Sequence, residues 1–77
     1  MKALIDGPGD LGALVRRIRE SEGMSQRQLA DALGVSHRYL GELELGKPKR
    51  ADANYFAVLS RLGIRLTAST ADRDDRA

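Results

Sequence analysis

Residues 25–46 read SQRQLADALGVSHRYLGELELG and contain two short helical patterns separated by Gly34. Ser25 is followed three positions later by Gln28, the pattern of a capping box at a helix N-terminus. Gly34 comes directly after the first pattern, at a position that favours the positive φ angle glycine adopts freely. Ser36 is a second helix cap at the start of the next pattern. The spacing therefore predicts a helix, a tight turn and a second helix.

The chain on either side of this pair adds two more helical patterns. Asp10 is expected to cap a first helix that Gly23 ends, and Asp52 to cap a fourth helix that Gly63 ends. Apolar side chains recur at helical spacing along all four patterns, which predicts one buried face for each helix. The apolar residues that define these faces are Leu11, Leu14, Val15, Ile18, Leu29, Ala30, Leu33, Leu40, Leu43, Tyr55, Phe56, Val58, Leu59 and Leu62.

Residues 64–68, Ile-Arg-Leu-Thr-Ala, alternate between apolar and polar side chains and predict one short strand. A lone strand has unpaired backbone groups, and the chain offers no second convincing strand. Pairing with the same strand of a second copy would satisfy those groups and bury Ile64, Leu66 and Ala68. The alternative is an extended segment that packs on the protein's own core.

The length of 77 residues predicts a single domain. We expect a flexible lead-in over residues 1–10, a folded domain over residues 11–68 and a disordered polar tail over residues 69–77. A chain this short is expected to be marginally stable alone, and dimerisation is one way to add buried area.

The composition argues against several classes of protein. There is no cysteine and His37 is the only histidine, so we expect no disulfide, no metal site and no cofactor. No apolar run approaches the roughly 20 residues of a membrane span and no signal peptide is visible, so we expect a soluble, cytoplasmic protein. No acidic pair stands at a recognisable catalytic spacing, so we do not expect an enzyme. The few aromatic residues form no RNA-stacking motif.

The net charge of +2 is unevenly distributed along the chain. Residues 11–50 carry eight basic and five acidic side chains, whereas the first ten and the last nine residues are each slightly acidic. Lys47, Lys49 and Arg50 fall within four positions. A basic centre between acidic ends fits an anionic partner for the centre only. A solvated basic face without a partner is the alternative.

Residues 23–47, GMSQRQLADALGVSHRYLGELELGK, resemble the Xre/Cro-type helix-turn-helix repressors. Ala30, Gly34, Leu40 and Leu43 follow the helix-turn-helix spacing Ala-x3-Gly-x5-Leu-x2-Leu. The likeness is to HipB-like antitoxins in particular, because the last helix runs directly into the strand. It implies a mainly α fold, a lambda-repressor-like domain of four to five helices with one short C-terminal strand pairing across a dimer.

The resemblance also implies which residues contact DNA. Arg38 can bond guanine O6 and N7, Gly41 lacks the polar side chain common in relatives, and Glu42 would read a cytosine amino group. A helix N-terminus favours phosphate, and basic side chains there set salt dependence. The implied base-reading residues are His37, Arg38, Gly41 and Glu42. The implied contacts to the DNA backbone are Ser25, Gln26, Ser36, Lys47, Lys49 and Arg50.

Two other features of the helices have structural interpretations. Arg16, Arg17 and Arg19 are expected to form a solvated face of the first helix. Glu44 resembles the glutamate of the family and is expected to be a structural hydrogen-bond partner.

The function implied is that of a sequence-specific transcriptional repressor, which binds an inverted-repeat DNA operator as a homodimer. The likeness to HipB-like proteins further implies the antitoxin of a toxin–antitoxin pair, a HipA-like kinase as the toxin, and association with the nucleoid. Two alternatives are a protein-interaction module that mainly neutralises a toxin, and a stand-alone Xre-type regulator.

Overall fold

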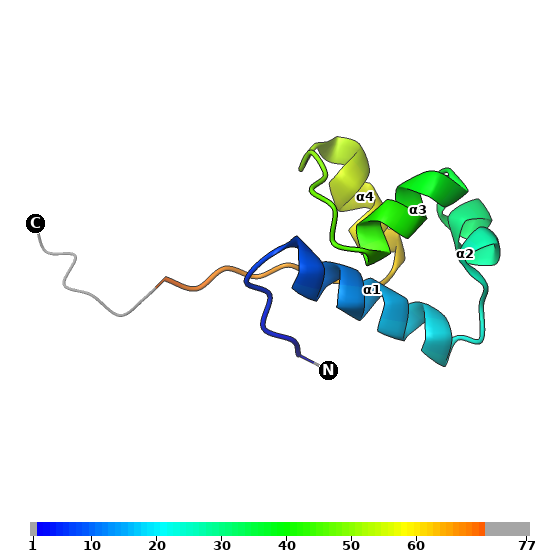
Figure 1. The fold of residues 1–77 in the computed structure, drawn as a ribbon. Coiled ribbons are helices and arrows are strands. Elements are labelled where there is room, and N and C mark those ends of the chain that lie inside the picture. The colour runs from blue at the N-terminus through cyan, green and yellow to red at the C-terminus, as the bar shows by residue number, and fades with distance from the viewer. Residues whose placement is uncertain (1, 71–77) are drawn as a thin grey trace, which may run out of the picture.

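The computed structural model describes residues 2–70 of the chain; most of the expected tail, residues 71–77, lies outside this range. The described residues contain four helices: α1 (Pro8–Ser21), α2 (Gln26–Leu33), α3 (His37–Glu44) and α4 (Ala53–Arg61). Both α1 and α2 pack against α3, which therefore lies at the centre of the domain (Figure 1). The mainly helical fold expected from the sequence is confirmed.

Three of the four helices begin at the caps that the sequence predicts. The Ser25 hydroxyl accepts a hydrogen bond from the Gln28 N–H at 3.1 Å, and the Gln28 side chain accepts one from the Ser25 N–H at 2.8 Å. These two bonds form the expected capping box of α2. Ser36 and Asp52 cap α3 and α4, each accepting from the N–H three residues onward. The start of α3 is thus fixed by its own local sequence.

The start of α1 differs from the expectation. The N-cap is Gly7, and Pro8 occupies the first turn, where its missing N–H leaves no bond unmade. Asp10 lies inside the first turn instead of capping it, and its carboxylate accepts a hydrogen bond from the Asp6 N–H at 2.9 Å. The prediction that Asp10 is the cap is therefore wrong, because the proline starts the helix earlier.

The turn between α2 and α3 has the predicted geometry. Gly34 adopts φ 73° and ψ 29°, in the left-handed region that side chains disfavour. Its N–H donates to the Asp31 carbonyl at 3.2 Å, and the Val35 N–H donates to the Ala30 carbonyl at 3.0 Å. These bonds satisfy carbonyls at the end of α2 and direct the chain into α3.

The core lies among the four helices and uses the apolar faces expected from the sequence. Phe56 is an exception, because 49% of its surface stays exposed on α4. No helix of the described residues is long and apolar enough to cross a membrane. The buried core residues are Leu11, Val15, Leu29, Ala30, Leu33, Leu40, Leu43, Val58 and Leu59.

α1 and α3 approach each other closely at Gly12, a residue for which the sequence predicts no special role. A Cβ atom at this position would clash with the Leu43 carbonyl oxygen and lie 2.7 Å from the Glu44 carbonyl oxygen. Glycine therefore lets the backbone of α1 lie directly against the C-terminal end of α3.

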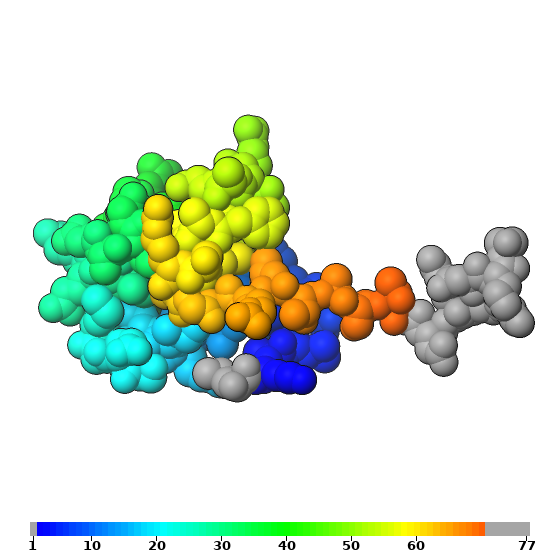
Figure 2. Space-filling model, turned by 180° about the vertical axis from the view of Figure 1, so that it is seen from behind, coloured from blue at the N-terminus to red at the C-terminus, as the bar shows by residue number. Residues whose placement is uncertain are grey.

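Residues 64–70 follow α4 without regular secondary structure. Figures 1 and 2 show this segment leaving the helical body. Ile64 stays half-buried against the core, with its N–H donating to the Leu59 carbonyl at 2.9 Å, whereas Leu66 is 48% exposed and Ala68 is exposed. The strand expected over residues 64–68 is absent from the described single chain, because a strand forms only with a backbone partner.

Candidate nucleic-acid interface

The four residues implied to read bases all lie on α3. His37 and Arg38 are exposed in its first turn, and Gly41 and Glu42 are half-buried one turn later. Gln26, the first residue of α2, contacts His37, the first residue of α3, so the N-termini of the two helices lie close together. The structure thus gathers the predicted base-reading positions along one helix.

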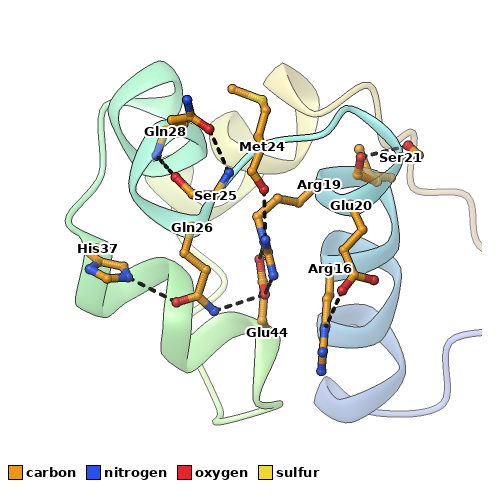
Figure 3. A network of polar contacts seen from close by, with 11 residues as sticks. Arg16, Arg19, Glu20, Ser21, Met24, Ser25, Gln26, Gln28, His37 and Glu44 are labelled. Atoms are coloured by element: carbon orange, nitrogen blue, oxygen red, sulfur yellow. Dashed lines mark hydrogen bonds and ion pairs between the residues drawn. The ribbon is translucent and has the colours of Figure 1, made fainter.

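A network of polar contacts links both ends of α3 to α1 and α2 (Figure 3). Arg19 on α1 contacts Glu44 at the end of α3, Glu44 contacts Gln26 at the start of α2, and Gln26 contacts His37. The network therefore connects three helices and ends at the first residue of α3. Glu44 is the structural hydrogen-bond partner that the sequence led us to expect.

Arg19 does not belong to the solvated face predicted for α1. Its Nε and Nη2 donate to the two carboxylate oxygens of Glu44 at 2.7 and 3.0 Å, and its Nη1 donates to the Met24 carbonyl at 2.9 Å. Hydrogen bonding to Glu44 raises the pKa of the Arg19 guanidinium, against the opposing effect of burial. Arg16, in contrast, is exposed and pairs with Glu20 one turn along the same helix.

Gln26 uses both ends of its side-chain amide inside the network. Its Nε2 donates to Glu44 Oε1 at 3.1 Å, and its Oε1 lies 3.1 Å from His37 Nε2. A Cβ atom added at Gly41 would lie 3.5 Å from the same Oε1, an ordinary contact distance. Gln26 is therefore positioned to hold His37 and also borders the surface of α3 at Gly41.

A second network joins Arg38, Glu42 and Lys49. Arg38 Nε donates to Glu42 Oε2 at 3.2 Å, and Lys49 Nζ donates to Glu42 Oε1 at 2.5 Å. These two hydrogen bonds lower the pKa of the Glu42 carboxyl below its ordinary value of 4.5, and the bond from Lys49 has the larger effect. Lys49 Nζ also lies 4.6 Å from the centre of the Tyr39 ring, and burial raises the pKa of the Tyr39 hydroxyl. Glu42 is thus charged and already paired with two cations.

The residues implied to contact the DNA backbone fall into two groups. The hydroxyls of Ser25 and Ser36 cap their helices, the side-chain amide of Gln26 is bonded to Glu44 and His37, and Lys49 Nζ is engaged with Glu42. Lys47 and Arg50 are exposed in the loop between α3 and α4. The second group is consequently the better placed to meet phosphate groups outside the protein.

One supporting contact comes from α4 and was not expected from the sequence. Arg61, near the end of α4, donates from Nη1 to the Leu33 carbonyl at 2.9 Å, which satisfies an acceptor at the C-terminus of α2. An arginine in the last turn of a helix signals interaction with that helix's own carbonyls, so no local signal points to this partner. Within residues 2–70, no group of three His, Asp or Glu side chains could hold a metal ion.

The chain is similar to known regulators over most of its length. The family model described as helix-turn-helix domain matches residues 10–75. The uncharacterized HTH-type transcriptional regulator y4mF of Sinorhizobium fredii is 40% identical over 66 residues, which cover 86% of this chain and 87% of that protein.

Solved structures give the same assignment. The clp gene regulator ClgR from C. glutamicum is 36% identical with a TM-score of 0.62, and the match covers 75% of each chain. A chain of the HipB–O4 20mer complex has a TM-score of 0.73 over 92% of this chain and 100% of its own length; at 21% identity it shares the fold. The chain therefore belongs to the helix-turn-helix family, among transcriptional regulators of the Xre type.

Proposed function

We propose that this regulator is a sequence-specific repressor that binds an inverted-repeat DNA operator as a homodimer. The observation that carries the proposal is the exposed first turn of α3, where the His37 side chain contacts Gln26 of α2 and the Arg38 side chain bonds to Glu42 one turn later. Side chains with few remaining conformations lose less entropy on binding, so a pre-ordered first turn suits base recognition. In this proposal His37, Arg38, Gly41 and Glu42 face the bases, and Lys47 and Arg50 face phosphate.

Arg38 has the geometry for guanine. Its Nε is bonded to Glu42, which leaves Nη1 and Nη2 for the O6 and N7 atoms of a guanine in the major groove. Glu42 would then orient Arg38, and Lys49 would hold Glu42. This arrangement also limits repulsion between Glu42 and the DNA, because its charge is matched by two cations.

The proposal extends to the role of antitoxin with a HipA-like kinase as the partner toxin, acting at the nucleoid. Its support is the fold shared with HipB over nearly the whole chain. Co-purification with the product of an adjacent kinase-like gene tests this part. A regulator that binds its operator and no such product would be a stand-alone Xre-type repressor.

The test of DNA reading is Arg38→Ala, with Arg16→Ala as a matched control. Both arginines are exposed and pair with a glutamate four residues onward at 3.2 Å, but only Arg38 lies on α3. After the operator is identified by selection from random DNA, Arg38→Ala should weaken operator binding by roughly fivefold to a hundredfold and random DNA binding much less. Equal losses on both DNAs would assign Arg38 to phosphate, and failure of the wild type to select any sequence would overturn the proposal.

A further inference from the structure

The Arg19–Glu44–Gln26–His37 network fixes the direction of every hydrogen bond along it (Figure 3). Both carboxylate oxygens of Glu44 face N–H groups of Arg19, which can only donate, so both oxygens accept. The Gln26 atom that faces Glu44 must therefore be the NH2 group, and the atom that faces His37 must be the carbonyl oxygen. The amide of Gln26 has no freedom to turn without placing two acceptors against each other.

The direction of these bonds determines the state of the His37 ring. Because Gln26 Oε1 only accepts, His37 Nε2 must carry the hydrogen of their 3.1 Å contact. A neutral imidazole has a single N–H, so the other nitrogen, Nδ1, is left with its lone pair as an acceptor. His37 is exposed at the first residue of α3, where this acceptor is available to a ligand.

We infer that His37 Nδ1 accepts a hydrogen bond from an exocyclic amino group in the major groove, either adenine N6 or cytosine N4. Guanine and thymine present only acceptors at the corresponding groove edge, so they would meet the lone pair of Nδ1 unfavourably. Gln26 is the positioning residue in this inference, because it sets which nitrogen of His37 faces the DNA. The inference rests on the proposed function and names the class of base that one of its residues reads.

Arg38, which follows His37 in the first turn of α3, should prefer bases that present acceptors. Arg38 offers only donors, which suit the acceptors of guanine, whereas His37, bonded to Gln26 through Nε2, offers the acceptor Nδ1 to an amino group. The first turn of α3 thus presents an acceptor and a donor group side by side. A half-site read by this turn should contain a guanine and, within a neighbouring base pair, an adenine or cytosine on the strand that His37 faces.

The first test needs no DNA. Nitrogen-15 NMR of the histidine ring, recorded on the full chain at a pH where histidine is generally neutral, reports which nitrogen carries the hydrogen. We expect His37 to be protonated at Nε2 in the wild type, and a mixture of the two forms in Gln26→Leu. A wild-type ring protonated at Nδ1 would overturn the inference whatever the protein binds.

The second test compares the sequences selected from random DNA by the wild type and by His37→Ala. The variant should lose a preference for adenine or cytosine at one position of each half-site, by roughly fivefold to a hundredfold, and keep the others. Gln26→Leu should reduce the same preference and leave the preference for the base that Arg38 reads.

If adenine is selected, its replacement by 2-aminopurine, which lacks the N6 amino group, should weaken wild-type binding and leave the binding of His37→Ala unaffected. Unchanged binding of the wild type would overturn the inference. If cytosine is selected, the His37-dependent preference for cytosine over thymine supports it.

The outcomes separate this inference from the function on which it rests. Loss of a preference for guanine or thymine in His37→Ala would mean that His37 donates, and the inference would fail while sequence-specific binding stood. A wild type without any sequence preference would instead remove the proposed function itself. If His37→Ala selects the same sequence as the wild type, His37 does not read a base and the inference fails.

Discussion

Arg19 on α1 and Glu44 at the end of α3 form a two-point ion pair, with Nε donating to Oε2 at 2.7 Å and Nη2 to Oε1 at 3.0 Å. Only 13% of the Arg19 side chain and 3% of the Glu44 side chain are exposed. Glu44 Oε1 also accepts from Gln26, which in turn holds His37. The ion pair that joins α1 to α3 therefore also supports Gln26 and, through it, His37 at the start of α3.

Removing the carboxylate from this pair should be costly. We expect Glu44→Ala to lower the free energy of unfolding by about 3 kcal/mol, because Arg19 would remain buried without its partner. The measurement is urea unfolding followed by circular dichroism. Glu20→Ala is the matched control, because its pair with Arg16 is exposed and should contribute at most about 1 kcal/mol. Similar small losses in both variants would contradict the structural role given to Glu44.

Two helical glycines should respond in opposite directions to the same substitution. Gly12→Ala drives a methyl group into the carbonyls of Leu43 and Glu44 and should destabilise the domain by about 1–3 kcal/mol. Gly41→Ala meets only Gln26 Oε1 at 3.5 Å and should stabilise the domain by about 0.5–1 kcal/mol, since glycine is a poor helix former. Thermal unfolding of the two variants gives the comparison. A stabilised Gly12→Ala would exclude the close approach of α1 to α3.

The features that could be predicted from the sequence are those set by neighbouring residues. Ser25 and Gln28 satisfy each other's backbone N–H groups within one turn. Gly34 adopts the left-handed conformation that glycine favours in a tight turn after a helix. Leu40 and Leu43 are buried because helical periodicity places them on one face. Each of these signals is local, so the order of helices and the position of the turn follow from the residues alone.

The features that could not be predicted depend on contacts between distant segments. Arg19 follows buried Val15 by four residues and therefore borders the apolar stripe of α1, but nothing near it in sequence identifies a partner 25 residues away. The need for glycine at position 12 follows from how closely α3 passes. The direction of the Gln26 amide follows from Glu44, and so the hydrogen position on His37 could not be deduced from the order of residues.

The stability of the domain should depend on pH through Glu42. Its pKa is lowered in the folded protein by hydrogen bonds from Lys49 and then Arg38. A lowered folded pKa means that the folded state binds fewer protons than the unfolded state, so this stabilisation is present above the ordinary value of 4.5 and is lost as the pH falls through the folded pKa.

Glu42→Gln should therefore be less stable than the wild type near neutral pH, and the two should converge in acid. Urea unfolding across this pH range measures the difference. Lys49→Met removes the first cause of the lowered pKa and should reduce the pH dependence that Glu42 contributes. A constant difference between wild type and Glu42→Gln at all pH values would argue against the Glu42 network.

In the proposed dimer, the two faces of residues 64–68 should differ in how strongly an introduced charge weakens dimerisation. Leu66→Asp should shift the protein toward monomer in sedimentation equilibrium, because a charge would be buried at the paired strands. Thr67→Asp is the control, because alternate residues of a strand point to opposite faces and Thr67 would lie on the other side. Equal dissociation in both variants, or a dimer unaffected by Leu66→Asp, would count against pairing through this strand.

The salt dependence of DNA binding should separate Lys47 from Lys49, which lie two residues apart. Lys47 is exposed, so Lys47→Ala should reduce the slope of log K against log salt by about 1, on operator and random DNA alike. Lys49 has only 15% of its side chain exposed, donates to Glu42 and lies over the Tyr39 ring, so Lys49→Ala should change the slope much less. Instead it should weaken discrimination at the base read by Arg38, because Glu42 loses its support. A slope that falls equally in both variants would mean that Lys49 leaves Glu42 to bind phosphate.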